Sequence, residues 1–202
     1  MTLLDGLSAD EEQFLVTLNS ASGGIPHFGG SAGDDIHLAT THVFYQGSFY
    51  QNAAIVLMVN TPCAFEVFSC NHIKYPTSKV VVTAADADSR TVFELNAEPA
   101  ALEYARLLNV AVGELSPELF ALHPLAVKVG GQYYIRSIQK VNEADFSLTF
   151  YCAVDVGIVL STVVMDDIFA SLSSELSRTT YQYGEPELVL TCDCFLRRLE
   201  IE

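Results

Sequence analysis

The chain has 202 residues, half of them apolar, and its 25 Asp and Glu outnumber its 10 Lys and Arg, which gives a formal net charge of −15 at pH 7. Such a length can bury a large core, while the acidic surface repels nucleic-acid phosphates and anionic lipids and excludes both as expected partners. Apolar runs such as AAIVLMV are far shorter than the roughly 20 residues of a membrane span, and the N-terminus does not resemble a signal peptide.

The first half of the chain predicts one helix and several strands. LLDGL at residues 3–7 is typical of the end of a buried strand. Ser8 followed by Glu11 is typical of a capping box, and the apolar spacing behind it predicts a helix from about 8 to 20. Strands follow, beginning with a hairpin that turns at Gln46-Gly47-Ser48. The predicted strand regions are 41–60, 64–70, 79–85 and 90–95.

The second half predicts helices and strands in alternation. Pro99 fits the first turn of a helix that continues to 108, and Ser116 with Pro117 predicts a short helix to 122. A hairpin around Gly130-Gly131 follows. Asp166 or Asp167 begins another helix. That helix continues to about 178. The remaining predicted elements are a strand run over 147–164, a strand over 186–192 and a terminal helix capped by Asp193.

This order of elements predicts a mixed α/β (α+β) fold with two lobes, in which flanking helices accompany mixed β-sheets. The change from strands to helix near residue 97 divides the chain into a first region, 1–97, and a second, 98–202. The five cysteines have no framework of spacings, which favours reduced thiols and a cytoplasmic location.

Residues 27–35, HFGGSAGDD, are the most unusual short stretch. Glycine-rich loops that hold phosphates usually end on a lysine, whereas this one ends on Asp34 and Asp35, which would repel an anion. The favoured interpretation is a structural loop, with glycines for tight or positive-φ backbone and aspartates that accept hydrogen bonds from nearby N–H groups. A ligand cleft lined by this loop is the alternative.

Few residues form a pattern with obvious chemistry. The sequence has no hydrolase elbow, dinucleotide fingerprint or paired-His metalloprotease motif. Cys192-Asp193-Cys194 lacks the further ligands of a zinc site. Because no nucleophile, base and orienting group can be assembled, an enzyme is the least expected class.

Two histidines stand out as possible ligands. His72 comes directly after a β-rich run with Phe65 and Phe68, which would place an imidazole beside an apolar region, and Pro76 would stiffen its loop. His123 precedes a proline, so its backbone is held extended. Each alone is more often a hydrogen-bonded structural histidine than a ligand.

Five longer stretches of the sequence carry a resemblance to a known family when taken together and in order. They are GGSAGDD (29–35), VVVTAADADSRTVFELNAEPAALEYARLL (80–108), HPLAVKVGGQYYIRSIQKV (123–141), SLTFYCAVDVG (147–157) and CDCFLRRLE (192–200). These stretches resemble the FIST sensory domain. Within them, YIRSIQ, SLTFYCAVD and DCFLRRLE, with the histidine of SCNHIKYP, resemble more narrowly its nitric-oxide-sensing haem branch, the NosP proteins.

The resemblance has consequences for organisation. It implies that 1–97 is the C-terminal part of a FIST N-type region, that 98–202 is a FIST C-type region, and that the sequence is the C-terminal portion of a longer family chain. Two turns depart from the family pattern. This chain has Asn96-Ala97 where the family usually has Asn-Gly, and Asp145-Phe146 where it usually has Asp-Gly.

For function, the resemblance implies a non-catalytic cytoplasmic sensor that binds haem b non-covalently through one axial histidine and senses nitric oxide. The partner would be a histidine kinase or a diguanylate cyclase or phosphodiesterase, and a homo-oligomer is compatible with this. His72 is the first candidate ligand and His123 the second, with basic residues for the haem propionates. Those basic residues are Arg136, Arg197 and Arg198.

Pairing with the abundant acids is the competing role for these arginines. The alternatives for the whole chain are a FIST module that senses a small metabolite, such as an amino acid, without haem, and a non-catalytic interaction module.

Overall fold

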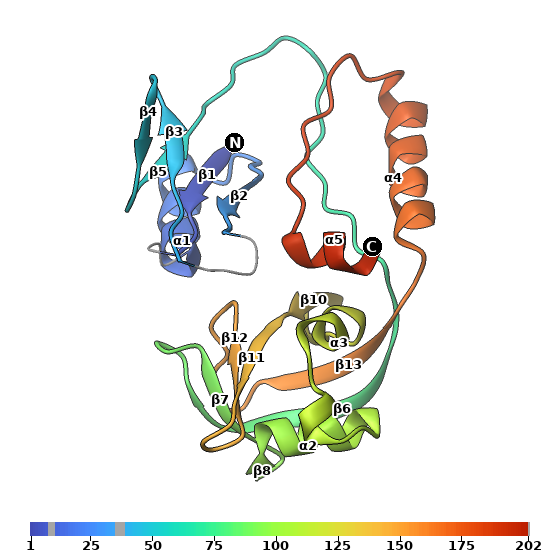
Figure 1. Ribbon diagram of the computed structural model, residues 1–202. Helices are drawn as coiled ribbons and strands as arrows, with labels where there is room; N and C mark the ends of the chain where they lie inside the picture. The colour runs from blue at the N-terminus through green and yellow to red at the C-terminus, as the bar shows by residue number, and fades with distance from the viewer. Residues whose placement is uncertain (8–10, 35–38, 202) are drawn as a thin grey trace. The chain divides into compact units, whose positions relative to one another are not determined.

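The computed structural model describes residues 1–7, 11–34 and 39–201, which form two compact units (Figure 1). Unit 1 contains Met1–Ser69 and Ser174–Arg198, and unit 2 contains Cys70–Ser173 and the residues from Leu199 on. Helices and mixed β-sheets occur together, which confirms the predicted fold class.

The sheet of unit 1 is built around β1 (Thr2–Asp5), so the LLDGL stretch is a strand as predicted. β1 pairs in parallel with β2 (Gly29–Ala32) and antiparallel with β5 (Ala54–Val56). α1 (Glu11–Ser22) connects the two parallel strands, as a parallel pair requires. Ser8, the predicted cap of this helix, lies outside the described residues.

A separate two-stranded hairpin belongs to the same unit. β3 (Val43–Tyr45) pairs with β4 (Ser48–Tyr50), and Gln46 and Gly47 form the turn with φ of 47° and 85°. Positive φ at both central residues matches the right-handed twist of the strands. The predicted turn is confirmed.

Two predicted strands are wrong. Neither 64–70 nor 186–192 forms a strand, although both runs are rich in β-forming residues. A strand needs a neighbour to pair its backbone N–H and C=O groups, and a favourable composition does not supply one. α4 (Ile168–Tyr183) and α5 (Phe195–Ile201) are the helices of this part of the chain.

Unit 2 contains a curled antiparallel sheet, and the strand order among the described residues is β10-β9-β13-β6-β7-β12-β11, with β8 paired to β7. Its strands are β6 (Ile73–Asp86), β7 (Thr91–Leu95), β8 (Glu98–Pro99), β9 (Leu125–Val129), β10 (Gln132–Arg136), β11 (Ile138–Asn142), β12 (Ser147–Phe150) and β13 (Val159–Met165).

The long strand β6 joins two parts of this sheet. Residues 73–81 pair with β13, and residues 82–86 pair with β7. Register shifts in both ladders allow the strand to bend between its two partners. Pro76, which the sequence placed in a stiff loop, lies inside β6 opposite Val163, next to one of these shifts. A proline is tolerated there because the ladder is already interrupted.

Two helices pack on the sheet of unit 2 (Figure 1). α2 (Ala100–Leu108) begins directly after Pro99, and α3 (Pro117–Leu122) begins where Ser116 accepts a hydrogen bond from Leu119 N at 3.3 Å, as its sequence predicts. The core residues from the helices are Ala100, Ala101, Tyr104 and Phe120, and those from the strands are Val80, Val82, Val92, Leu95, Leu125, Ile138, Leu148, Phe150 and Leu160. No described helix is both long and apolar enough to cross a membrane.

Candidate functional site

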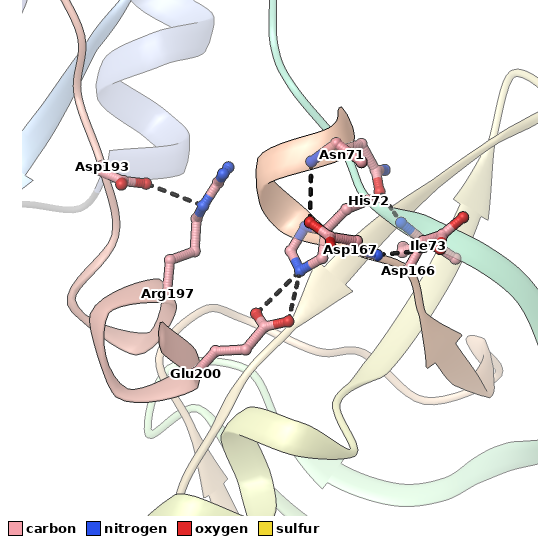
Figure 2. Close-up of polar contacts among 9 residues, drawn as sticks. Asn71, His72, Ile73, Asp166, Asp167, Asp193, Arg197 and Glu200 are labelled. Carbon is pink, nitrogen blue, oxygen red and sulfur yellow. Dashed lines mark hydrogen bonds and ion pairs between the residues drawn. The ribbon is translucent and has the colours of Figure 1, made fainter. Parts of the chain in front are cut away.

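His72 lies directly before β6, and its side chain is only 6% exposed. Its Nε2 is within 2.8 Å of Glu200 Oε1 and 2.9 Å of Glu200 Oε2, so both carboxylate oxygens face one ring nitrogen (Figure 2). Glu200 is in the last turn of α5, and its side chain is 15% exposed. A shielded pair of this kind is much less screened by water and salt than a surface ion pair.

The backbone on either side of His72 is fixed. The His72 carbonyl accepts a hydrogen bond from Asp166 N at 2.7 Å, where β13 gives way to α4. Asn71 Oδ1 accepts from Ile73 N at 2.9 Å, and Asn71 Nδ2 donates to the Tyr133 carbonyl at 2.7 Å. The position of the imidazole is therefore set by three segments of unit 2 that are distant in sequence.

The aspartates that follow β13 have structural roles. Asp167 accepts a hydrogen bond from Ala170 N at 2.9 Å and caps α4, as predicted for Asp166 or Asp167. Asp166 lies 4.0 Å from Lys74 Nζ, and both side chains are more than half exposed. An exposed pair at this distance contributes little.

The described arrangement does not fit an axial haem ligand at His72. An axial bond needs a ring nitrogen directed at the iron, whereas Nε2 faces the Glu200 carboxylate. The apolar slot expected from Phe65 and Phe68 is not formed by a strand before His72, because Phe65 is exposed and Phe68 has the Arg178 guanidinium 6.0 Å from its ring centre. In the described part of the chain, no three His, Cys, Asp or Glu side chains converge as a metal site.

His123, the second candidate, ends α3, and its residue is exposed. Its carbonyl accepts a hydrogen bond from the hydroxyl of the buried Tyr104 at 2.7 Å, and burial raises the pKa of that phenol well above its ordinary value. Its N–H donates to the Leu119 carbonyl at 3.0 Å. The backbone of His123 thus has a structural role, and its side chain is open to solvent.

The three predicted propionate partners lie on two elements. Arg136 is in β10 and donates from Nη1 to the Ile135 carbonyl at 3.1 Å. Arg197 and Arg198 are neighbours on α5. Arg197 Nε is 3.0 Å from Oδ1 of Asp193, which lies just before α5 (Figure 2). Arg197 therefore pairs with an acid, which is the competing role that the composition favours.

The stretch HFGGSAGDD is structural in the described residues. Gly29–Ala32 form β2, and a Cβ added at Gly29 would stand 1.8 Å from the Thr2 carbonyl oxygen. The φ angles of Gly29 and Gly30 are not positive, so of the two expected reasons for these glycines, tight backbone applies, and close approach to β1 explains Gly29. Asp34 accepts hydrogen bonds from two backbone N–H groups, as expected, at 2.8 and 3.1 Å. Asp35 lies outside the described residues.

Sequence reasoning missed two carboxylates. Glu200 is separated from His72 by 128 residues, and no local pattern marks the pair. Asp5 is 2% exposed and accepts hydrogen bonds from the Thr41 hydroxyl and from Asn52 N. The signal for Asp5 was present, because an aspartate that ends a buried strand needs backbone or hydroxyl donors.

Family comparisons divide the chain into two matches. Residues 1–98 match the family model described as the FIST N domain, and residues 100–202 match the one described as the FIST C domain. No curated protein and no solved structure shows significant similarity to the chain. The strands β6 and β7 fall within the first match, although they belong to the sheet of unit 2.

Proposed function

The chain belongs to the FIST family, and on that premise we propose that it is a non-catalytic sensory module that binds a small molecule and regulates a signalling partner. FIST domains are sensory and signal-transduction modules. The observation that carries the proposal is that the two family matches together extend over almost the whole chain. The proposed partner is a histidine kinase or an enzyme that makes or degrades cyclic di-GMP.

The finer form of the proposal is a haem b sensor of nitric oxide with His72 as the axial ligand. It is supported by the likeness of three sequence stretches to NosP proteins and by the shielded imidazole at 6% exposure. Against it stands the Glu200 carboxylate, which faces the nitrogen that a metal would use. Haem at His72 therefore requires an arrangement in which this carboxylate is displaced.

Haem titration followed by the Soret band tests this form directly. The parent chain and His123→Ala should take up haem, whereas His72→Ala should lose the band or keep a weak one that added imidazole restores. Glu200→Gln should bind haem more tightly than the parent, because an amide competes less well than a carboxylate for the imidazole N–H. A full Soret band in His72→Ala would eliminate His72 as the axial ligand. Loss of the band only in His123→Ala would make His123 the axial ligand.

The contact between His72 Nε2 and the Glu200 carboxylate favours a second candidate, a FIST module that senses a small metabolite without haem. In that case the chain stays colourless in the titration. A ligand that binds only the folded state raises the melting temperature by mass action. A thermal-shift panel of amino acids with the parent chain should then identify the ligand, and an unresponsive, colourless chain would support an interaction module instead.

A further inference from the structure

Residues 36–65 contain no Asp, Glu, Lys or Arg, although the whole chain has 25 acidic and 10 basic residues. The described part of this stretch includes the β3–β4 hairpin and β5. Large apolar side chains here are exposed rather than buried, and together they are named the neutral surface. It consists of Phe44, Tyr45, Phe49, Tyr50, Val56, Leu57, Met58 and Val59.

The hairpin presents two phenylalanine rings on one face. Phe44 and Phe49 are opposite each other on β3 and β4, with ring centres 5.0 Å apart, and they are 57% and 72% exposed. The His42 ring stands edge-on to Phe49 at 6.2 Å. Val43 points to the other face of the ribbon and is buried. The hairpin is thus anchored through Val43 on one face, which also carries Tyr45 and Tyr50, and Phe44 and Phe49 form an aromatic pair on the opposite face.

Few apolar side chains are buried within unit 1, so most of its large apolar residues are not part of a core. Of its described apolar residues, Leu4 and Val43 are buried, and α1 buries none. Soluble monomers rarely leave a large contiguous apolar surface exposed, and such a surface usually marks an interface.

The strand edges next to the neutral surface are also open in the described residues. β4 pairs only with β3, and β5 pairs only with β1 (Figure 1). Natural proteins protect such edges with lysines or other charges, which this stretch lacks. The edges can therefore accept a further strand.

We propose that two copies of this chain associate through the neutral surface. With a net charge of −15 per chain, two copies repel each other wherever acidic faces meet. The neutral surface is a place where they can approach without burying like charges. A basic partner would be recognised by acidic side chains, and residues 36–65 contain none. The charge pattern thus fits a second copy better than a cationic protein.

The available area is sufficient for a weak dimer. At about 150–250 Å² for each aromatic side chain, the partly exposed side chains of the neutral surface offer at most on the order of 800 Å² per chain. A standard interface buries about 800 Å² per partner. Tyr45 and Tyr50 lie on the face of the hairpin opposite Phe44 and Phe49, so only part of this surface can face one partner. We therefore expect a dissociation constant in the micromolar range or weaker.

Sedimentation analysis of the full chain over a wide concentration range tests the dimer. The mass should rise from 22.0 kDa toward twice that value. Added salt should strengthen association, because it screens the repulsion between two acidic chains, whereas an interface made of ion pairs would weaken. Phe49→Ser should raise the dissociation constant at least about tenfold. Tyr181→Ser, at a 95% exposed aromatic position on α4, is the matched control and should leave it within about twofold.

Hydrogen exchange on the unmodified chain gives a second readout that needs no variant. Backbone amides of 43–56 should become more protected as concentration rises. A chain that stays monomeric at all concentrations overturns the proposal, as does a dimer in which Phe49→Ser and Tyr181→Ser have equal effects. Protection that is equal at low and high concentration would mean that one chain covers its own surface, and would also overturn it.

Discussion

Replacing Ala97 by glycine should stabilise the protein. Asn96 and Ala97 form the two-residue turn between Leu95 and Glu98, with φ of 54° and 64°. A turn with positive φ at both positions favours Asn-Gly, and an alanine in the left-handed region costs roughly 1–2 kcal/mol. Ala97 is exposed, so its methyl group contributes little packing, and its N–H would still donate to Thr83 Oγ1 at 2.9 Å.

Glycine also gives the unfolded chain more freedom, which costs about 0.4–1 kcal/mol. The net gain for Ala97→Gly is then about 0.5–1 kcal/mol, or about 1–4 °C in melting temperature for a chain of this size. Thermal unfolding followed by circular dichroism measures it. Ala170→Gly, at an exposed position in the first turn of α4, is the control and should lose up to about 0.5–1 kcal/mol. If both variants melt below the parent by similar amounts, strain at Ala97 is not what limits this turn.

Two further predictions concern stability. Gly29→Ala should destabilise unit 1 by about 1–3 kcal/mol because the new methyl group meets the Thr2 carbonyl. In the control variant Gly30→Ala, the new methyl group has only an ordinary contact at 3.7 Å, so this variant should melt like the parent. Equal melting temperatures of the two variants would refute the close approach at Gly29. Hydrogen bonds from Arg106 hold the pKa of Glu103 below its ordinary 4.5, so the stability they contribute is complete above pH 4.5 and is lost as pH falls through the lowered pKa. Urea unfolding of the parent and Arg106→Gln should therefore differ most near neutral pH and converge in acid, and a gap that is constant with pH would contradict this assignment.

Local signals in the sequence predicted the elements that local chemistry determines. Ser116 and Pro117 begin α3 as expected, and Gly130 and Gly131, both with positive φ, turn the β9–β10 hairpin. Both departures from the family pattern, at Ala97 and Phe146, fall at positive φ, where glycine would be the less strained residue. Turns and caps involve a few adjacent residues, so their chemistry is visible in one short stretch.

The features that sequence reasoning missed all depend on distant partners. The run 64–70 has the composition of a strand but no neighbour to pair with in the described residues. Pro76 was expected in a loop, and the register shift of β13 admits it into a strand. His72 was expected where a strand ends beside an apolar region, but it lies directly before β6, and the carboxylate of Glu200 that faces it comes from the last turn of α5. Long-range pairing of this kind is decided by the whole fold.

The position of β6 limits how this protein can be divided or recombined. The sequence families meet near residue 99, yet β6 and β7, which precede that point, are interior strands of the sheet to which the following strands belong. A gene fusion or exchange with its breakpoint there would separate β6, with the core residues Val80 and Val82, from β13 and the strands that follow. Productive exchanges should instead use two breakpoints, near residues 70 and 173, so that β6 is inherited together with the sheet that it completes and the two segments of unit 1 stay together.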